Sequence, residues 1–298
     1  MFKKAILLSF VAASTVLGAP APSQTDLIDI DVLNFALTLE HLENAFYTQG
    51  LAKYSPQDFE RQGYPDWVRG RFEQISGHEA EHVKFLSSAL GDTAVKPCEY
   101  NFQDKSPKSF IATSMVLETV GASAYLGGAK LLADNTDLLT AAGSILAVES
   151  RQASWITSAV MKLEPWNGPF DIPLTPSGAF SLAAPFIKSC PSSNPPLPVK
   201  TFPQLKISPT DPNEGAQVTV KYIKPSDAPD GDRYVAWLDG LQAVFTKVNK
   251  DGKAKVPDGL MGTVYAAVVK SKDMPDDNTM ESGFAVVQFP FSSMADTN

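Results

Sequence analysis

Histidine and cysteine are scarce in this chain, which has three histidines and two cysteines in 298 residues. So few histidines severely limit chemistry based on imidazole, and all three lie between residues 41 and 82. Two cysteines exclude a small, disulfide-dense scaffold. Basic charge is also short, since the net charge is −8. Because phosphate contacts need a basic face, the composition disfavours a sequence-independent nucleic-acid binder.

Two further features bear on where the protein goes. The chain has no Asn-x-Ser/Thr acceptor, so we expect no N-glycosylation. Its N-terminus carries Lys3 and Lys4, an apolar run over 5–17 and then small residues, which is typical of a secretory signal. We therefore expect a signal peptide over residues 1–18 and a secreted protein, extracellular or in the cell wall. The run is shorter than the roughly 20 residues of a membrane anchor, and no later segment reads as a membrane span.

Export affects the interpretation of the two cysteines. Cys98 and Cys190 are an even pair, and secreted proteins fold under oxidising conditions. A bridge between them would close a loop of roughly 90 residues and stabilise the fold by about 4 kcal/mol in the chain-entropy model. We expect this disulfide, and two buried free thiols are the alternative.

The first half of the chain has the apolar period of helices. Apolar residues recur at a spacing of 3.6 in four segments, and a shorter fifth helix follows. The predicted helices span residues 27–50, 66–90, 107–133, 137–162 and 176–187. The third and fourth are joined by about three residues and must be antiparallel neighbours. The 16 residues between the second and third can cross the length of a helix, which favours a four-helix bundle with one long crossover.

The pattern changes after residue 190. Residues 191–204 are rich in proline and predict a semi-extended linker. Short strand-like runs follow, separated by Asp-Gly pairs that indicate turns. The predicted strands span residues 218–223, 234–239, 243–248, 263–270 and 283–289. We expect an α+β multidomain fold, with a helical bundle over 27–190 and a small immunoglobulin-like β-sandwich over 205–298.

Each of the four long predicted helices has a glutamate on its apolar face. These residues are Glu40, Glu79, Glu118 and Glu149. Each lies near the midpoint of its helix, so packed helices would bring the four carboxylates to one level of the core. A buried carboxylate must be protonated, paired or bound to a metal. Few lysines or arginines share these faces, so one or two divalent metal ions are the simplest counter-charge.

The glutamates also belong to an internal repeat. Glu40 and Glu118 are each followed seven residues later by a tyrosine, Tyr47 and Tyr125. Glu79 is followed three residues later by His82, on the same face of its helix. Glu149 is followed at the same spacing by Gln152. Carboxylate di-iron sites are built from two glutamates and two Glu-x-x-His motifs on four helices. This chain has the same pattern, except that glutamine stands at the position of the second histidine.

With these motifs the sequence resembles the ferritin-like superfamily, over roughly residues 27–190. More closely, it is similar to secreted fungal ferritin-like proteins linked to stress and late sexual development, which are related to plant desiccation-related proteins. The segment GHEAEHVKFL is also similar to the second-helix motif of rubrerythrins. The segments that carry the resemblance are LNFALTLEHLENAFYTQGL (33–51), GHEAEHVKFL (77–86), SMVLETVGASAYLGGAKLL (114–132) and ILAVESRQASWI (145–156).

The resemblance implies a metal centre. Its ligands would be Glu40, Glu79, His82, Glu118 and Glu149, with Gln152 where the family pattern has histidine. An amide oxygen is a weaker ligand than imidazole, so the site would hold two ions, one ion or none. Iron or manganese is implied, with ferroxidase-like or manganese-catalase-like chemistry. We interpret Tyr47 and Tyr125 as core tyrosines that donate hydrogen bonds to the carboxylates.

Several alternatives stay open at this point. Glu43, one turn from Glu40, is a second candidate ligand, and the carboxylates could share protons without metal. His41 and His78 fall off the apolar faces and are expected at the surface or at caps. The second functional hypothesis is a metal-free extracellular scaffold whose β-domain contacts a cell wall, matrix or partner. A homodimer is compatible with either hypothesis.

Overall fold

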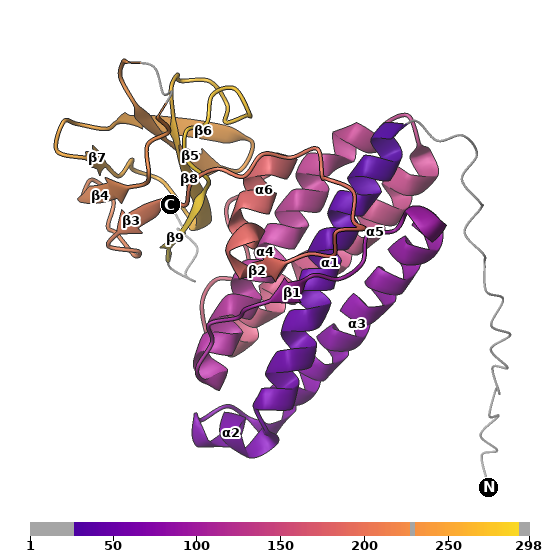
Figure 1. The fold of residues 1–298 in the computed structure, drawn as a ribbon. Helices are drawn as coiled ribbons and strands as arrows, with labels where there is room; N and C mark the ends of the chain where they lie inside the picture. The colour runs from indigo at the N-terminus through magenta and orange to yellow at the C-terminus, as the bar shows by residue number, and fades with distance from the viewer. Residues whose placement is uncertain (1–26, 227–229, 292–298) are drawn as a thin grey trace, which may run out of the picture.

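The protein has a helical part followed by a part made of β-strands, as the computed structural model shows (Figure 1). The structure describes residues 27–226 and 230–291. The predicted signal peptide, residues 1–18, lies outside these ranges. The coarse α+β organisation predicted from the sequence is confirmed.

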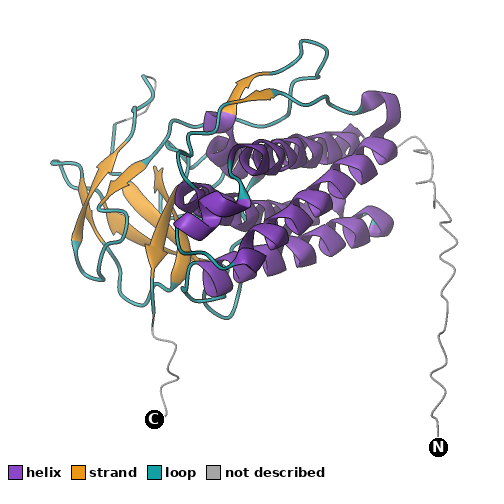
Figure 2. Cartoon of the chain, turned by 90° about the horizontal axis from the view of Figure 1, so that it is seen from below, coloured by secondary structure: helices purple, strands orange, loops and turns teal. Residues whose placement is uncertain are grey.

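Four long helices carry the glutamates. They are α1 (Leu27–Lys53), α3 (Asp66–Leu90), α4 (Pro107–Gly128) and α5 (Thr136–Trp155). Short helical segments extend or connect them: α2 (Pro56–Arg61), η1 (Gly91–Thr93), η2 (Ala129–Leu132), the π-turn η3 (Ile156–Val160), α6 (Pro176–Ala183) and η4 (Ala184–Phe186). Helix α1 packs beside α3, and α4 packs beside α5, with the four helix axes running side by side (Figures 1 and 2).

Side-chain caps set several helix starts. Ser106 caps α4 by accepting a hydrogen bond from the Ser109 amide, and Pro107 fills the first turn. Asn135 caps α5 in the same way. The prediction that Gly50 ends the first helix is wrong, because α1 continues to Lys53. Gly50 instead lies against the ring of Phe110, which a Cβ would overlap.

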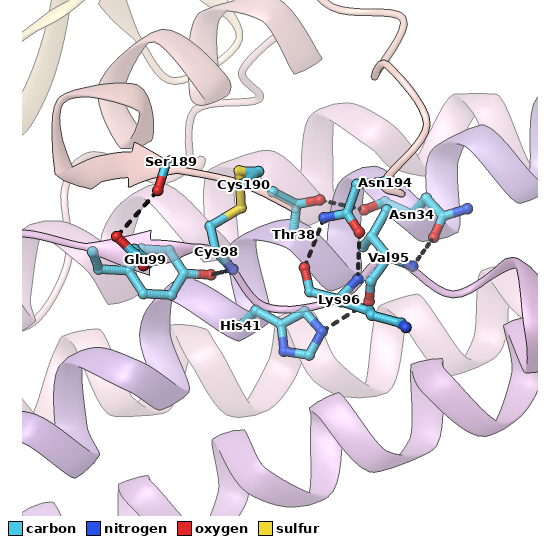
Figure 3. Close-up of a disulfide and its surroundings, with 11 residues drawn as sticks. Asn34, Thr38, His41, Val95, Lys96, Cys98, Glu99, Ser189, Cys190 and Asn194 are labelled. Carbon is cyan, nitrogen blue, oxygen red and sulfur yellow. Dashed lines mark hydrogen bonds between the residues drawn. A yellow bond between two sulfur atoms is a disulfide. The ribbon is translucent and has the colours of Figure 1, made fainter. Parts of the chain in front are cut away.

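The crossover between α3 and α4 is joined to the segment that follows α6 by strand pairing and a disulfide. Strand β1 (Glu99–Tyr100) pairs with β2 (Ile187–Ser189), and Cys98 and Cys190 form the predicted disulfide beside them (Figure 3). The ring of His41 lies under the crossover, with its Nε2 3.1 Å from the Val95 carbonyl oxygen. His41 is therefore buried, and its predicted place at the surface is wrong. The crossover covers a position that the helical pattern alone leaves open.

The strands form two antiparallel sheets. The three-stranded sheet has the order β3 (Lys206–Ser208), β4 (Gln217–Lys221), β7 (Lys253–Lys255). The four-stranded sheet has the order β6 (Gln242–Lys247), β5 (Tyr234–Asp239), β8 (Gly262–Val269), β9 (Ala285–Phe289). Inward-facing residues of both sheets, such as Val218, Val235 and Val264, share one apolar core.

The four-stranded sheet lies between the other sheet and the helices. On β8, Val264 and Ala266 face the three-stranded sheet, whereas Tyr265 and Ala267 join the core of the helical part. The Tyr265 hydroxyl donates to the Thr119 carbonyl oxygen at 3.0 Å. Every residue of β8 is buried for this reason. The β-part is packed on the helices as part of a continuous core.

One helical stretch of the described residues, Pro107–Leu132, is long and apolar enough to cross a membrane by length and composition. This stretch was not predicted as a membrane span from the sequence. However, 67% of its most apolar window is buried against the rest of the protein. It is therefore explained as a core helix, and the described residues contain no clear membrane span.

Candidate metal centre

The four predicted glutamates come from the four long helices and are completely buried. Glu40 lies on α1, Glu79 on α3, Glu118 on α4 and Glu149 on α5, each with 0% of its surface exposed. Each glutamate is buried because it lies on the face of its helix that also carries the apolar core residues. The acidic side chains are therefore held by packed secondary structure and do not depend on loops.

Three of these glutamates and His82 form a compact donor group. Glu40, Glu79, His82 and Glu149 each offer a ligand atom, and these atoms all lie within 4.8 Å of one another. His82 Nδ1 lies 3.2 Å from Glu40 Oε2 and 3.0 Å from Glu79 Oε2. The three-residue spacing on α3 puts Glu79 and His82 on one face, as expected. One nitrogen and three carboxylates are a donor set suited to iron or manganese.

Two tyrosines from the repeat orient the carboxylates. Tyr125, on α4, donates to Glu40 Oε1 on α1 at 2.5 Å. Tyr47, on α1, donates to Glu118 on α4 and also lies 2.6 Å from the Ser114 hydroxyl. Each tyrosine thus reaches across to the glutamate of the other helix pair. The predicted role of both as hydrogen-bond donors to carboxylates is confirmed.

Gln152 lies in the same layer and contacts Glu79. Its Nε2 donates to Glu79 Oε1 at 2.8 Å, and the same nitrogen lies 3.4 Å from His78 Nδ1. The other amide atom, Gln152 Oε1, is buried without a partner. Gln152 thus uses one donor to hold Glu79 and leaves one neutral oxygen for another partner. Its role as a metal ligand stays a prediction.

A fifth glutamate belongs to the cluster. Glu43 is 4% exposed, and a Cβ placed on Gly121 would approach Glu43 Oε1 to 2.9 Å while overlapping Glu149 Oε2. The two carboxylate oxygens are therefore neighbours over the bare backbone of Gly121. From the sequence, Glu43 was an alternative ligand to Glu40, but the structure buries both. The usable signal was its spacing, because Glu43 lies three residues after Glu40 and four before Tyr47.

Three carboxylate oxygens of this cluster have no hydrogen-bond partner among the described residues. These are both side-chain oxygens of Glu149 and Glu118 Oε2. A buried polar atom without a partner is costly and requires an explanation such as a bound ion. Ion pairs to the five glutamates come only from His82, within the part of the chain that the structure describes. The orphaned oxygens fit a bound cation.

The charges and burial shift the pKa values strongly. Burial raises the pKa of Glu40 to about 7, with the charge of Glu79 acting in the same direction. Burial, followed by the neighbouring carboxylates, also raises the pKa values of Glu43 and Glu149 well above their ordinary range. Burial alone would lower the pKa of His82, but its hydrogen bonds to Glu40 and Glu79 raise it to about 10. Without a metal, these glutamates therefore keep their protons to a higher pH than exposed glutamates do.

Comparison with known proteins agrees with this arrangement. A family model described as a ferritin-like domain matches residues 28–162, which include all five glutamates and His82. The protein rds1 of Schizosaccharomyces pombe (strain 972 / ATCC 24843) is 29% identical over 182 residues. The matched region is 60% of this chain and 44% of that relative, so the chain spans less than half the relative's length. The helical part is thus similar to ferritin-like domains.

Proposed function

We propose that the protein is a secreted ferritin-like metalloprotein that binds iron or manganese between its four long helices, in a stress or developmental response. The observation that carries the proposal is the set of buried, unpartnered carboxylate oxygens beside a four-residue donor group. The ferritin-like family match supports the same interpretation. The N-terminal signal pattern and the disulfide, which is typical of oxidising compartments, support secretion.

The residues divide into two groups around the proposed site. Glu40, Glu79 and His82 would hold one ion, with Glu149 completing the group. Glu118 and Glu43 would add carboxylates for a second ion beside Glu149. A bound iron or manganese ion would supply redox chemistry toward oxygen or peroxide. Ferroxidase-like or manganese-catalase-like activity is therefore proposed.

The protein's own side chains would tune that centre. Tyr125 and Tyr47 each hold one oxygen of a glutamate, which fixes the direction of its other oxygen. Gln152 does the same for Glu79. The apolar core around the layer keeps bulk water from the carboxylates, because the glutamates are fully buried. These contacts would keep the donor atoms in place before an ion arrives.

The direct test replaces two donors together, as Glu79→Gln with His82→Leu. Metal bound per chain is measured by elemental analysis after purification without chelators. The proposal expects wild-type protein to bind about one or two ions and the variant to lose most of them. The metal-free variant should keep its melting temperature or gain stability, because a buried charge group has been removed.

The matched control is Glu81→Gln, on the same helix. Glu81 is 70% exposed and pairs with Lys84, so its replacement should leave metal content unchanged. Wild-type protein with less than about one-tenth equivalent of transition metal would overturn the metal proposal. That result would favour the metal-free scaffold, in which the immunoglobulin-like β-part contacts a wall, matrix or partner.

A further inference from the structure

An apolar cavity lies next to the glutamate cluster, at one end of the helical part. Its volume is about 110 Å³, and its lining comes from α1, α3, α4, η2, α5, the start of α6 and linker residues 198–199. Nearly all of its walls are aliphatic or aromatic, and Asp31 is the one charged residue among them. Characteristic lining residues are Ala36, Phe85, Tyr125, Leu131, Ala141 and Ile145.

The helices that supply the candidate ligands also build this cavity. Ala36 lies one turn before Glu40, and Ile145 lies one turn before Glu149. Phe85 and Leu86 follow His82 by about one turn on α3. Residues one turn apart on a helix share a face, so the cavity lies one helical turn from the carboxylate layer.

Tyr125 connects the cavity to the cluster. Its side chain lines the cavity, while its hydroxyl donates to Glu40 Oε1 at 2.5 Å. A molecule in the cavity would therefore lie against a ring that is hydrogen-bonded to a candidate metal ligand. The cavity also reaches the surface, because its lining residues Phe85 and Leu131 are 44% and 37% exposed.

The size and chemistry of the cavity define its ligand. An apolar cavity of ~150 Å³ stays dry and binds benzene, so one of about 110 Å³ suits a ring or a chain of about six carbons. It is too small for a helix or strand of a partner protein. Its walls offer almost no polar partner, which disfavours sugars and charged metabolites.

We propose that this cavity binds small apolar molecules that carry an aromatic ring or a short alkyl chain. These molecules would be substrates that lie against the ring of Tyr125, whose hydroxyl contacts the carboxylate centre. The proposal that the cavity binds such molecules depends only on the residues that line it. Its role as a substrate site rests on the proposed function, since it requires a metal in the centre. The two parts are therefore tested by separate measurements.

Binding is tested first in metal-free, full-length protein by fluorine NMR with 4-fluorotoluene and 1-fluorohexane. Wild-type protein should show saturable binding of at least one of them. Ala141→Phe fills the cavity and should weaken binding by about tenfold or more. Ala147→Phe is the matched control, because Ala147 is an exposed residue of the same helix outside the cavity, and it should bind as wild type.

A second variant keeps this test decisive if Ala141→Phe folds poorly. Leu131→Asp places a charge at the partly exposed rim and should also weaken binding. Absence of saturable binding to wild-type protein overturns the proposal, as does unchanged binding to Leu131→Asp together with a folded Ala141→Phe. Because this measurement uses no metal, its failure is distinct from failure of the metal site.

The link to the centre is tested with cobalt(II) as a coloured probe ion. Addition of 4-fluorotoluene or 1-fluorohexane, whichever binds, should change the visible absorption of the cobalt-loaded protein. Tyr125→Phe keeps the ring and should bind the probe molecule with a reduced spectral response. If cobalt binds but the spectrum ignores the bound molecule in wild-type protein, the substrate role is overturned. If cobalt does not bind, the proposed metal function fails with it, while the binding result stands.

Discussion

Gly121 shows how tightly the acidic side chains pack at the scale of single residues. A Cβ at this position would overlap Glu149 Oε2 and press on Glu43 Oε1. We expect Gly121→Ala to push the Glu149 carboxylate out of place and to lower metal affinity by about tenfold or more. Titration of the metal-free protein with manganese(II) measures this.

The control for Gly121→Ala is Gly143→Ala on α5. Gly143 is exposed, and a Cβ there meets nothing within 4 Å. Alanine is a better helix former than glycine, so this variant should gain up to about 1 kcal/mol of stability with unchanged metal affinity. Equal metal affinities for the two variants would contradict the packing that we describe around Glu149.

The raised pKa values predict how the metal-free protein responds to pH. The pKa of Glu40 rises from 4.5 to about 7, and those of Glu43, Glu118 and Glu149 are raised well above 4.5. A carboxyl with a raised native pKa stabilises the fold fully below its unfolded pKa, and this stabilisation is lost as pH rises through the native pKa. His82 acts in the same direction, with its contribution lost as pH rises from 6.5 through about 10.

We therefore expect the melting temperature of metal-free protein to fall between pH 5 and pH 8, by roughly 5 °C or more. Calorimetry with and without manganese(II) provides the measurement. The ion should restore stability at pH 8, because it replaces the protons as counter-charge. A metal-free melting temperature that rises over this range would mean that the glutamates are not buried together.

Single-residue predictions from the sequence succeeded where helical spacing decides burial. Glu40, Glu79, Glu118 and Glu149 stand out because charges interrupt an apolar face. Glu43 was harder to judge, since one helix can bury two neighbouring positions when two partner helices cover it. Burial of His41 depends on the crossover above it, and no local pattern reports the path of a loop.

At the scale of elements, the sequence predicts what local chemistry controls. Ser106, Asn135 and Thr175 cap helices through their own side chains, so these starts can be read directly. Gly50 misleads, because its lack of a side chain serves close packing against Phe110. The three-residue strands β3 and β7 were missed, because such short runs carry no clear alternation and depend on their neighbours in the sheet.

The disulfide provides a prediction at the element scale. It joins the crossover to the chain after α6, and the two cysteines are 92 positions apart in the sequence. In the chain-entropy model such a loop gives about 4 kcal/mol, which corresponds to roughly 10 °C in melting temperature. We expect Cys98→Ser with Cys190→Ser to melt lower by about this amount, with unchanged far-ultraviolet circular dichroism. An unchanged melting temperature would mean that the bridge does not constrain the unfolded chain.

At the scale of the whole molecule, the helices and the β-part share apolar core. Strand β8 is buried along its whole length, with Tyr265 facing the helices and Val264 facing the other sheet. The continuous apolar run of this strand is the sequence signal for burial on both faces. Which surface covers the second face is a tertiary property, and the strand pattern cannot identify it.

The shared core predicts cooperative unfolding. We expect full-length protein to melt in one calorimetric transition, because separating the parts would expose Tyr265, Ala267 and Phe284 to water. Circular dichroism and tryptophan fluorescence should give the same midpoint. Two resolved transitions would indicate that the β-part folds as an independent module, connected to the helices only by the linker of residues 191–204.

The central claim is that the buried glutamates and His82 form a metal site. The most direct measurement is a crystal structure of the protein loaded with manganese or iron, with anomalous difference maps recorded at the absorption edge of that metal. Our account predicts a peak bounded by Glu40, Glu79, His82 and Glu149. A loaded crystal with no peak among these side chains, or with its strongest peak elsewhere in the protein, would contradict it.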